Sequence, residues 1–177
     1  MMRKKTLFVA ILLAAASIGG MVGTTPTTVH AKTRSLTTFP KRYRHTWYHY
    51  IGHGKYDTQK FTAKTWQYTS HAGGYVKVKS SLHPTSTYPY QHKEHSSWVF
   101  GSTIFARKAH WINIKLWNQN AGYGDYYKTS TKKYHGKKIS TLSAASGLVQ
   151  TSDHYYRSKK VAKQLKNHHF KGEVYEH

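Results

Sequence analysis

The chain has 177 residues, with 28 lysines and arginines, six aspartates and glutamates, 14 histidines and no cysteine. Six carboxylates are few for the usual hydrolase, kinase or metal chemistry, and the lack of cysteine excludes disulfides, thiolate zinc sites and cysteine nucleophiles. The length fits one domain, and a formal net charge of +22 favours anionic partners.

The N-terminal residues have the pattern of a secretory signal peptide. Three basic residues precede an apolar run over 7–18, and Val29-His30-Ala31 supplies small residues at a cleavage site. As a helix, this run would span about 18 Å, short of the roughly 30 Å hydrocarbon core of a membrane. We predict cleavage between Ala31 and Lys32. Residues 1–31 are then a signal peptide, and residues 32–177 a single secreted domain without a transmembrane segment.

Two opposing signals bear on whether residues 32–177 fold. Leu, Ile, Val and Phe make up only 22 of these 146 residues, and the net charge without the three basic residues of the leader is +19, which is typical of disorder. Against this, all five tryptophans and all 15 tyrosines lie in this part, and such side chains bury large areas. We expect a folded domain with an aromatic core, because the aromatic residues follow a regular pattern.

The pattern has a period of two, which indicates half-buried strands of an antiparallel sheet. In residues 74–80, Val76 and Val78 fall on the face opposite the lysines, and residues 110–117 alternate in the same way. Segments rich in Gly, Asn and Pro separate such runs and predict turns, with a longer polar loop over 81–95. We predict about eight strands: 44–51, 60–68, 74–80, 98–105, 110–117, 126–131, 137–142 and 153–157.

Two short segments are predicted to be helical. Thr38 can cap a turn that contains Pro40 near its start, and Ser158 can cap a helix over 159–166 with a short apolar stripe. The alternative for the second segment is that it only ties the C-terminus to the sheet.

Two other segments echo each other, Asp125-Tyr-Tyr-Lys-Thr-Ser130 and Asp153-His-Tyr-Tyr-Arg-Ser158. One such pair is too short to establish a duplication, so we interpret the two segments as equivalent edge strands.

A short capped turn ending at Tyr43 leads into Arg44-His-Thr-Trp-Tyr-His-Tyr50. This stretch resembles the N-terminal Gly-Thr-Trp-Tyr motif of small lipocalin-like secreted proteins of lactic acid bacteria, and segments 124–128, 136–139 and 154–158 are similar to the same group. The resemblance implies a mostly β protein with a single antiparallel lipocalin/calycin-like barrel, to which we add the short C-terminal helix. It also implies that Trp47 plugs the barrel floor.

Charge is the strongest chemical signal. Residues 128–171 contain eleven lysines and arginines and one acidic residue, with tyrosines and histidines between them. Such clusters suit polyanions, because cations neutralise phosphates while aromatic rings stack on bases or sugars. The alternative is that charge only keeps the protein soluble. We predict ten polyanion-binding residues: Lys128, Lys132, Lys133, Lys137, Lys138, Arg157, Lys159, Lys160, Lys163 and Lys166.

An exported domain without cysteine is typical of Gram-positive bacteria, and there the nearest polyanions are teichoic acids and anionic lipid headgroups, followed by extracellular nucleic acid. We therefore predict a secreted, non-catalytic binding protein of the cell envelope, released or held on the cell wall by charge. The alternative is a small-molecule binder that uses the barrel mouth, since a small barrel either fills with side chains or holds one ligand. No cofactor is expected, and the sequence carries no signal for an oligomeric state.

Neither metal nor catalytic chemistry is expected. His45, His49 and His53 recur every four residues, which on a strand separates neighbours by about 13 Å, too far to share zinc, and we expect them to face solvent. No serine lies in a nucleophile elbow, and no spacing brings Glu94 and Asp125 together. The sequence therefore predicts that the protein is not an enzyme.

Overall fold

The computed structural model describes residues 33–71, 73–85, 95–119, 123–147 and 149–176. The predicted signal peptide, its cleavage site at Ala31 and Lys32, and Glu94 lie outside these residues. The described part of the chain forms one 3-10 turn, η1 (Lys41–Tyr43), and one helix, α1 (Lys159–Leu165). Its strands are β1 (Arg34–Ser35), β2 (Thr46–Gly52), β3 (Lys55–Phe61), β4 (Thr65–Ser70), β5 (Val76–His83), β6 (Trp98–Ala106), β7 (Ala109–Leu116), β8 (Asp125–Tyr134), β9 (Lys137–Ser146) and β10 (Gln150–Tyr156).

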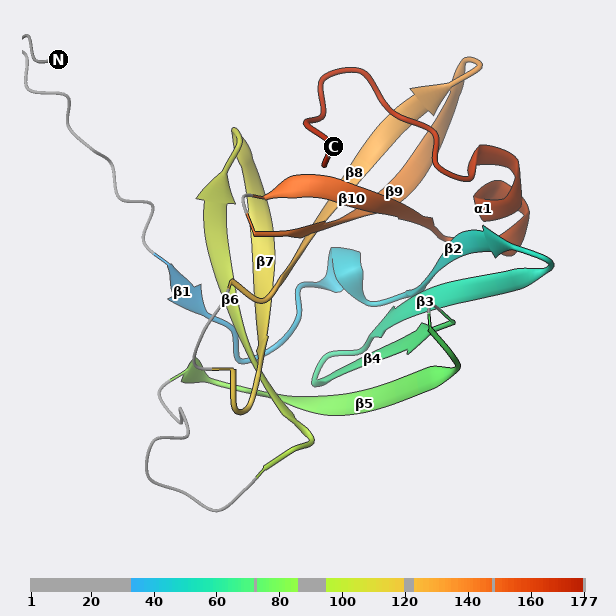
Figure 1. The fold of residues 1–177 in the computed structure, drawn as a ribbon. Helices are drawn as coiled ribbons and strands as arrows, with labels where there is room; N and C mark the ends of the chain where they lie inside the picture. The colour runs from blue at the N-terminus through green and yellow to red at the C-terminus, as the bar shows by residue number, and fades with distance from the viewer. Residues whose placement is uncertain (1–32, 72, 86–94, 120–122, 148, 177) are drawn as a thin grey trace, which may run out of the picture. The chain divides into compact units, whose positions relative to one another are not determined.

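Nine strands close into a barrel. The hydrogen-bonded order runs from β6 through β5, β4, β3, β2, β10, β9 and β8 to β7, and β7 pairs with β6 again, while β1 adds to β6 from outside. Neighbours are antiparallel except β5 and β6, which are parallel, as the long connection between His83 and Trp98 permits. Figure 1 shows the strands as a ring with η1 at its far end. The predicted mostly β barrel with one short C-terminal helix is confirmed.

The predicted strand over 60–68 is wrong, because a turn divides it into β3 and β4. The hydroxyl of Thr62 accepts hydrogen bonds from the backbone N–H groups of Lys64 (3.3 Å) and Thr65 (2.9 Å). The backbone N–H of Thr62 also donates to the carbonyl of Thr65 at 2.9 Å. A threonine side chain thus makes the turn that Gly, Asn or Pro usually makes.

The two segments that echo each other are not edge strands. Asp125 begins β8, which pairs with β7 and β9, and Asp153 lies in β10, which pairs with β9 and β2. Both strands are therefore internal to the barrel wall, and the interpretation as equivalent edges is wrong.

Large aromatic side chains fill the end of the barrel next to η1. Phe39, Tyr43 and Trp47 are at most 1% exposed, and the indole N–H of Trp47 donates to the Tyr43 carbonyl at 2.9 Å. The Phe61 ring meets the rings of Phe39 and Tyr127 edge-on, with centroids 5.1 and 5.5 Å apart. Such geometry directs positive ring edges onto negative ring faces. This part of the core is packed, as the aromatic composition predicts.

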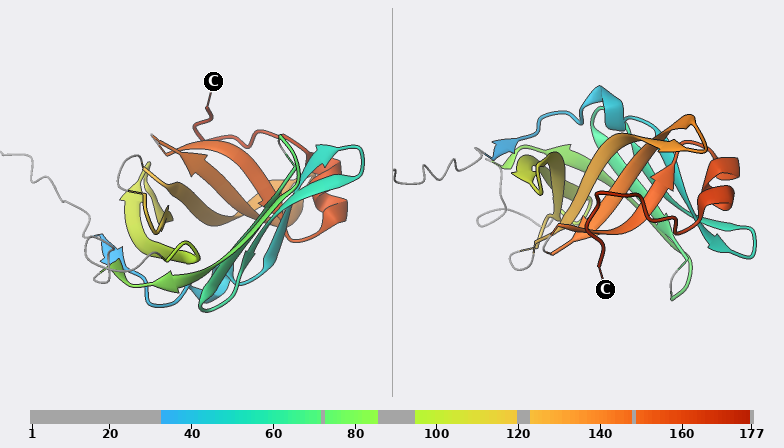
Figure 2. Two further views of the ribbon diagram at one scale, coloured as in Figure 1. Left: turned by 60° about the horizontal axis from the view of Figure 1, so that its bottom comes forward. Right: turned by 90° about the horizontal axis from the view of Figure 1, so that it is seen from above.

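Helix α1 covers the outer face of the barrel. Ser158 caps it as predicted, because the serine hydroxyl accepts a hydrogen bond from the backbone N–H of Val161 at 3.2 Å. Ala162 and Leu165 are buried against Tyr156 of β10 and Phe170 of the C-terminal segment. Figure 2 shows α1 beside β2, with the C-terminal segment crossing β8–β10. Among the described residues, no helix combines the length and apolar character that a membrane span requires.

The burial of Trp47 leads to a stability prediction. We expect Trp47→Ala to lower the free energy of unfolding by about 3–5 kcal/mol, the range for large aromatic deletions in a packed core. Ile51→Ala is the matched control, because Ile51 lies on the same strand but is 38% exposed. Chemical denaturation of both variants measures the difference. A Trp47→Ala loss equal to that of the control would contradict the packing role.

Candidate functional site

The β8–β9 hairpin and α1 form a basic groove on the outside of the barrel. Its volume is about 450 Å³, and its walls include Tyr134, His135, Lys137, Lys138 and Lys160. The hairpin turns tightly at His135 and Gly136, which both have positive φ (45° and 74°), as a type I′ turn requires. The three lysines are exposed, and no carboxylate of the described residues lines the groove. We call this set of five residues the basic groove.

The other predicted polyanion-binding residues are dispersed. Lys133, Lys163 and Lys166 are exposed on the same hairpin or helix region, outside the lining of the groove. The Arg157 guanidinium lies 5.3 Å from the centre of the Trp47 ring, and the Lys159 ammonium lies 5.2 Å from that of Tyr56. These last two cations contact aromatic rings of β2 and β3 through cation–π interactions.

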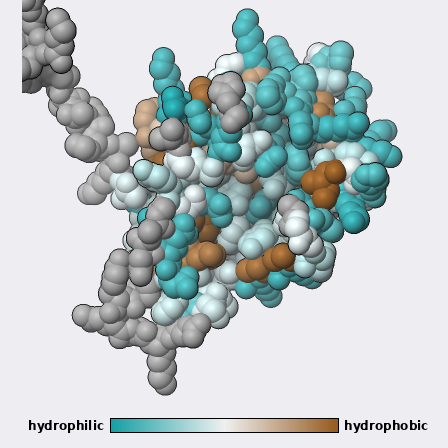
Figure 3. All heavy atoms as spheres, viewed as in Figure 1, coloured by the Kyte–Doolittle hydropathy of each residue, from teal (hydrophilic) through white to brown (hydrophobic). Residues whose placement is uncertain are grey.

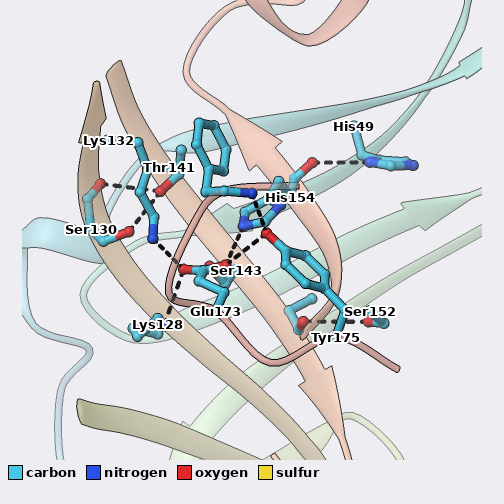
Figure 4. Close-up of polar contacts among 12 residues, drawn as sticks. His49, Lys128, Ser130, Lys132, Thr141, Ser143, Ser152, His154, Glu173 and Tyr175 are labelled. Atoms are coloured by element: carbon cyan, nitrogen blue, oxygen red, sulfur yellow. Dashed lines mark hydrogen bonds and ion pairs between the residues drawn. The ribbon is translucent and has the colours of Figure 1, made fainter. Parts of the chain in front are cut away.

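Lys128 and Lys132, also predicted to bind polyanions, point instead at an internal carboxylate. Their ammonium groups lie 3.2 and 2.6 Å from Glu173 Oε1, and each side chain is 17% exposed. The structure therefore uses these two lysines in a contact with the C-terminal segment. Figure 4 shows Glu173, on the C-terminal segment, with Lys128 and Lys132 of β8 on one side and His154 of β10 on the other.

His154 completes the set that we call the Glu173 cluster (Glu173, Lys128, Lys132 and His154). Its Nε2 lies 2.6 Å from Glu173 Oε2. The Tyr175 hydroxyl donates to the same oxygen at 3.3 Å. Burial alone would raise the pKa of Glu173, but hydrogen bonds from His154 and Lys132 and the charge of Lys128 lower it well below its ordinary value of 4.5. Glu173 is thus held as a carboxylate, and it neutralises cations that the C-terminal segment covers.

A second site lies inside the barrel, at the end away from η1. We call it the mouth cavity; its volume is about 350 Å³. Three aspartates, Asp57, Asp125 and Asp153, line it together with the rings of Trp66, Tyr68, Tyr127 and Tyr155. Small residues from β9 and β10 also line the cavity: Ala144, Ala145, Ser146 and Ser152. The interior is therefore packed near η1 and hollow at the mouth, where short side chains leave space.

The three aspartates differ in their partners. Asp57 accepts hydrogen bonds from the backbone N–H and Nδ1 of His71 at 2.8 and 3.0 Å. Asp153 lies 3.5 Å from Nε2 of His49. Asp125 has no ion-pair partner among the described residues. Although Asp125 is an exposed residue, its carboxylate loses hydration against the cavity wall, and this raises the pKa of Asp125.

Local backbone structure directs the β10 residues into the mouth cavity. A β-bulge between Thr151 and Asp153 shifts the register of β10 against β9. Ser152 and its neighbour Asp153 both line the cavity as a result, whereas successive residues of a regular strand point to opposite faces.

His49 corrects the expectation of solvent-facing histidines. It is 7% exposed, and its Nδ1 donates to the carbonyl of His154 at 2.9 Å. His154 itself is 2% exposed, whereas His45 and His53 are exposed as expected. Within the described residues, no group of three or more histidines and carboxylates is placed to hold a metal ion.

The sequence did contain a signal for the mouth cavity, which the search for paired carboxylates around Glu94 and Asp125 missed. In each echoed segment an aspartate comes two residues before a cavity tyrosine, Asp125 before Tyr127 and Asp153 before Tyr155. Residues two apart on a strand share a face, so each segment delivers one carboxylate and one phenol to the same space.

Comparison with known proteins assigns no relative. No protein-family model matches the chain, and no curated protein or solved structure matches it significantly. The resemblance to lipocalin-like proteins of lactic acid bacteria stays a prediction.

The Glu173 cluster predicts how stability depends on pH. A carboxylate with a lowered pKa in the folded state adds stability that is fully present above its ordinary pKa and is lost as the pH falls from about 5 to 2. We expect Glu173→Gln to lower the free energy of unfolding at pH 7 by about 2–4 kcal/mol, because it leaves covered cations without their counter-charge. The variant should also lose less stability than the parent between pH 5 and pH 2.

Denaturant unfolding at several pH values measures both effects. Glu176→Gln is the control, because Glu176 is exposed and its carboxylate contacts only the hydroxyl of Ser146 among the described residues. Parallel pH profiles for Glu173→Gln and the parent would show that the cluster does not stabilise the fold.

Proposed function

We propose that the protein is a secreted, non-catalytic binding protein of the bacterial cell envelope, which attaches by charge to anionic polymers such as teichoic acid. The observation that carries the proposal is the basic groove, where three exposed lysines from β9 and α1 converge beside Tyr134 and His135. The proposal makes this groove the centre of the polymer contact. The surrounding cations of α1 and the β8–β9 hairpin then extend it.

The physical basis is the neutralisation of phosphates. A polymer with phosphate groups carries condensed counterions, and lysines that replace them release those ions, so binding weakens as salt rises. A groove without carboxylates keeps its lysines available for this role. The exposed face in Figure 3 is predominantly hydrophilic, with its few hydrophobic residues in separate patches, which favours a charge-based contact over an apolar one.

Substitution of the groove lysines tests the proposal. Lys137→Gln, Lys138→Gln and Lys160→Gln together should lower affinity for purified teichoic acid by about 100-fold at low salt, since each lysine near an anionic surface contributes about 1 kcal/mol. The dependence of log affinity on log salt should flatten by about two to three units in the triple variant. Binding isotherms at several salt concentrations measure both quantities.

The matched control removes the same charge elsewhere. Lys55, Lys77 and Lys79 are exposed residues of β3 and β5, so their change to Gln lowers the net charge by the same three units away from the groove. An equal loss of affinity in both triple variants would mean that total charge, and not the groove, determines binding.

The mouth cavity favours a second candidate, a binder of small molecules. A volume of about 350 Å³, walls of aromatic rings and a few convergent polar groups are typical of ligand sites. This candidate uses the inside of the barrel, and the first uses its outside, so the two functions are compatible.

A further inference from the structure

The charges of this protein are distributed unevenly between the inside and the outside of the barrel. The chain contains 28 lysines and arginines, yet none of those that the structure describes lines the mouth cavity. Three of its six carboxylates do, namely Asp57, Asp125 and Asp153. Half of the acidic residues of this cationic chain therefore line the mouth cavity.

We propose that the mouth cavity binds a small organic cation, whose ammonium group lies between the aspartates and the aromatic rings. This inference rests on the second candidate function, the binding of a small molecule at the barrel mouth, and it names the chemical class of that molecule. The hollow itself, its ring-lined wall and its carboxylates are the three observations that support it.

The aromatic wall selects an organic cation among possible ligands. The rings of Trp66 and Tyr68 lie 5.2 Å apart, and those of Trp66 and Tyr127 lie 6.3 Å apart, so they form one continuous surface. Ring faces carry negative potential and attract ammonium groups, most strongly where water is excluded. Tyr127 and Tyr155 are at most 8% exposed, which places their rings in the dry part of the cavity.

Charge argues against anionic and metallic ligands. An anion would meet three carboxylates, and no lysine or arginine of the described part of the chain lines the cavity to offset them. Burial raises the pKa of Tyr155 most, a hydrogen bond with Gln59 opposes this, and the charges of the three aspartates raise it further. A metal ion needs several ligands within about 2.6 Å, and the described histidines and carboxylates provide no such group.

The cavity should respond to salt differently from the basic groove. The lysines that repel a cationic ligand lie outside the barrel, while the aspartates that attract it line the cavity. Added salt screens distant charges over a Debye length of about 10 Å at 0.1 M, and close, partly buried pairs much less. Cation binding should therefore weaken less with salt than polymer binding does.

Two probes of the same shape test the charge preference. Phenyltrimethylammonium and tert-butylbenzene differ in one atom and in charge, and both can be titrated into the purified protein while tryptophan fluorescence is followed. We expect the cation to bind at least about tenfold more tightly, the effect of one close charge pair at an intermediate dielectric. Asp125→Asn should remove most of that preference, because Asp125 has no ion-pair partner among the described residues that would compensate.

The controls separate this inference from the function on which it rests. Asn167→Lys raises the net charge by one unit, as Asp125→Asn does, at an exposed residue that does not line the cavity, and it should leave the affinity for the cation unchanged. Circular dichroism verifies that both variants are folded. Equal binding of the two probes would overturn the cation preference and leave the small-molecule function standing. If neither probe binds, both proposals fail.

Discussion

The Glu173 cluster holds the C-terminal segment against the outside of the barrel. Among the described residues, β10 is registered against β2 by one pair, Tyr156 with Tyr48, so the backbone contributes little at this seam. Helix α1 and the C-terminal segment cover it from outside, and Glu173 fastens that segment to β8 and β10. Without this carboxylate, the segment would bury two lysines and a histidine with no opposite charge, which is strongly unfavourable. One acidic residue thus allows the C-terminal segment to pack over cations of β8 and β10.

Four of the five described carboxylates divide between two separate roles, and this separation shapes the surface. Glu173 serves the fold, while Asp57, Asp125 and Asp153 face the mouth cavity. The outside of the barrel is left to the cations, which converge at the basic groove between α1 and the β8–β9 hairpin. Inner and outer faces of one barrel wall therefore carry opposite charge, as the alternation of side chains along a strand allows.

Local patterns predicted most of the strands, while the barrel came from the family resemblance, and what the patterns missed has both local and long-range causes. Alternation and the Ser158 cap are local, so the strands and α1 follow from the sequence. The Thr62 turn lacks Gly, Asn and Pro, and the alternating pattern conceals it. The burial of His49 could have been inferred, because it shares a strand face with Trp47. The convergence of three aspartates could not, because the barrel's closure sets how β3, β8 and β10 meet.

Strand β10 links the two charged centres through neighbouring residues. Asp153 lines the mouth cavity, and His154 points the other way and binds Glu173. His49 joins them across the seam, since its Nδ1 donates to the His154 carbonyl while its Nε2 lies 3.5 Å from Asp153. The ion cluster outside the barrel therefore holds the strand that presents a carboxylate inside it. Asp153 and His154 thus place one side chain on each face of β10, while the backbone of both residues is paired with β9.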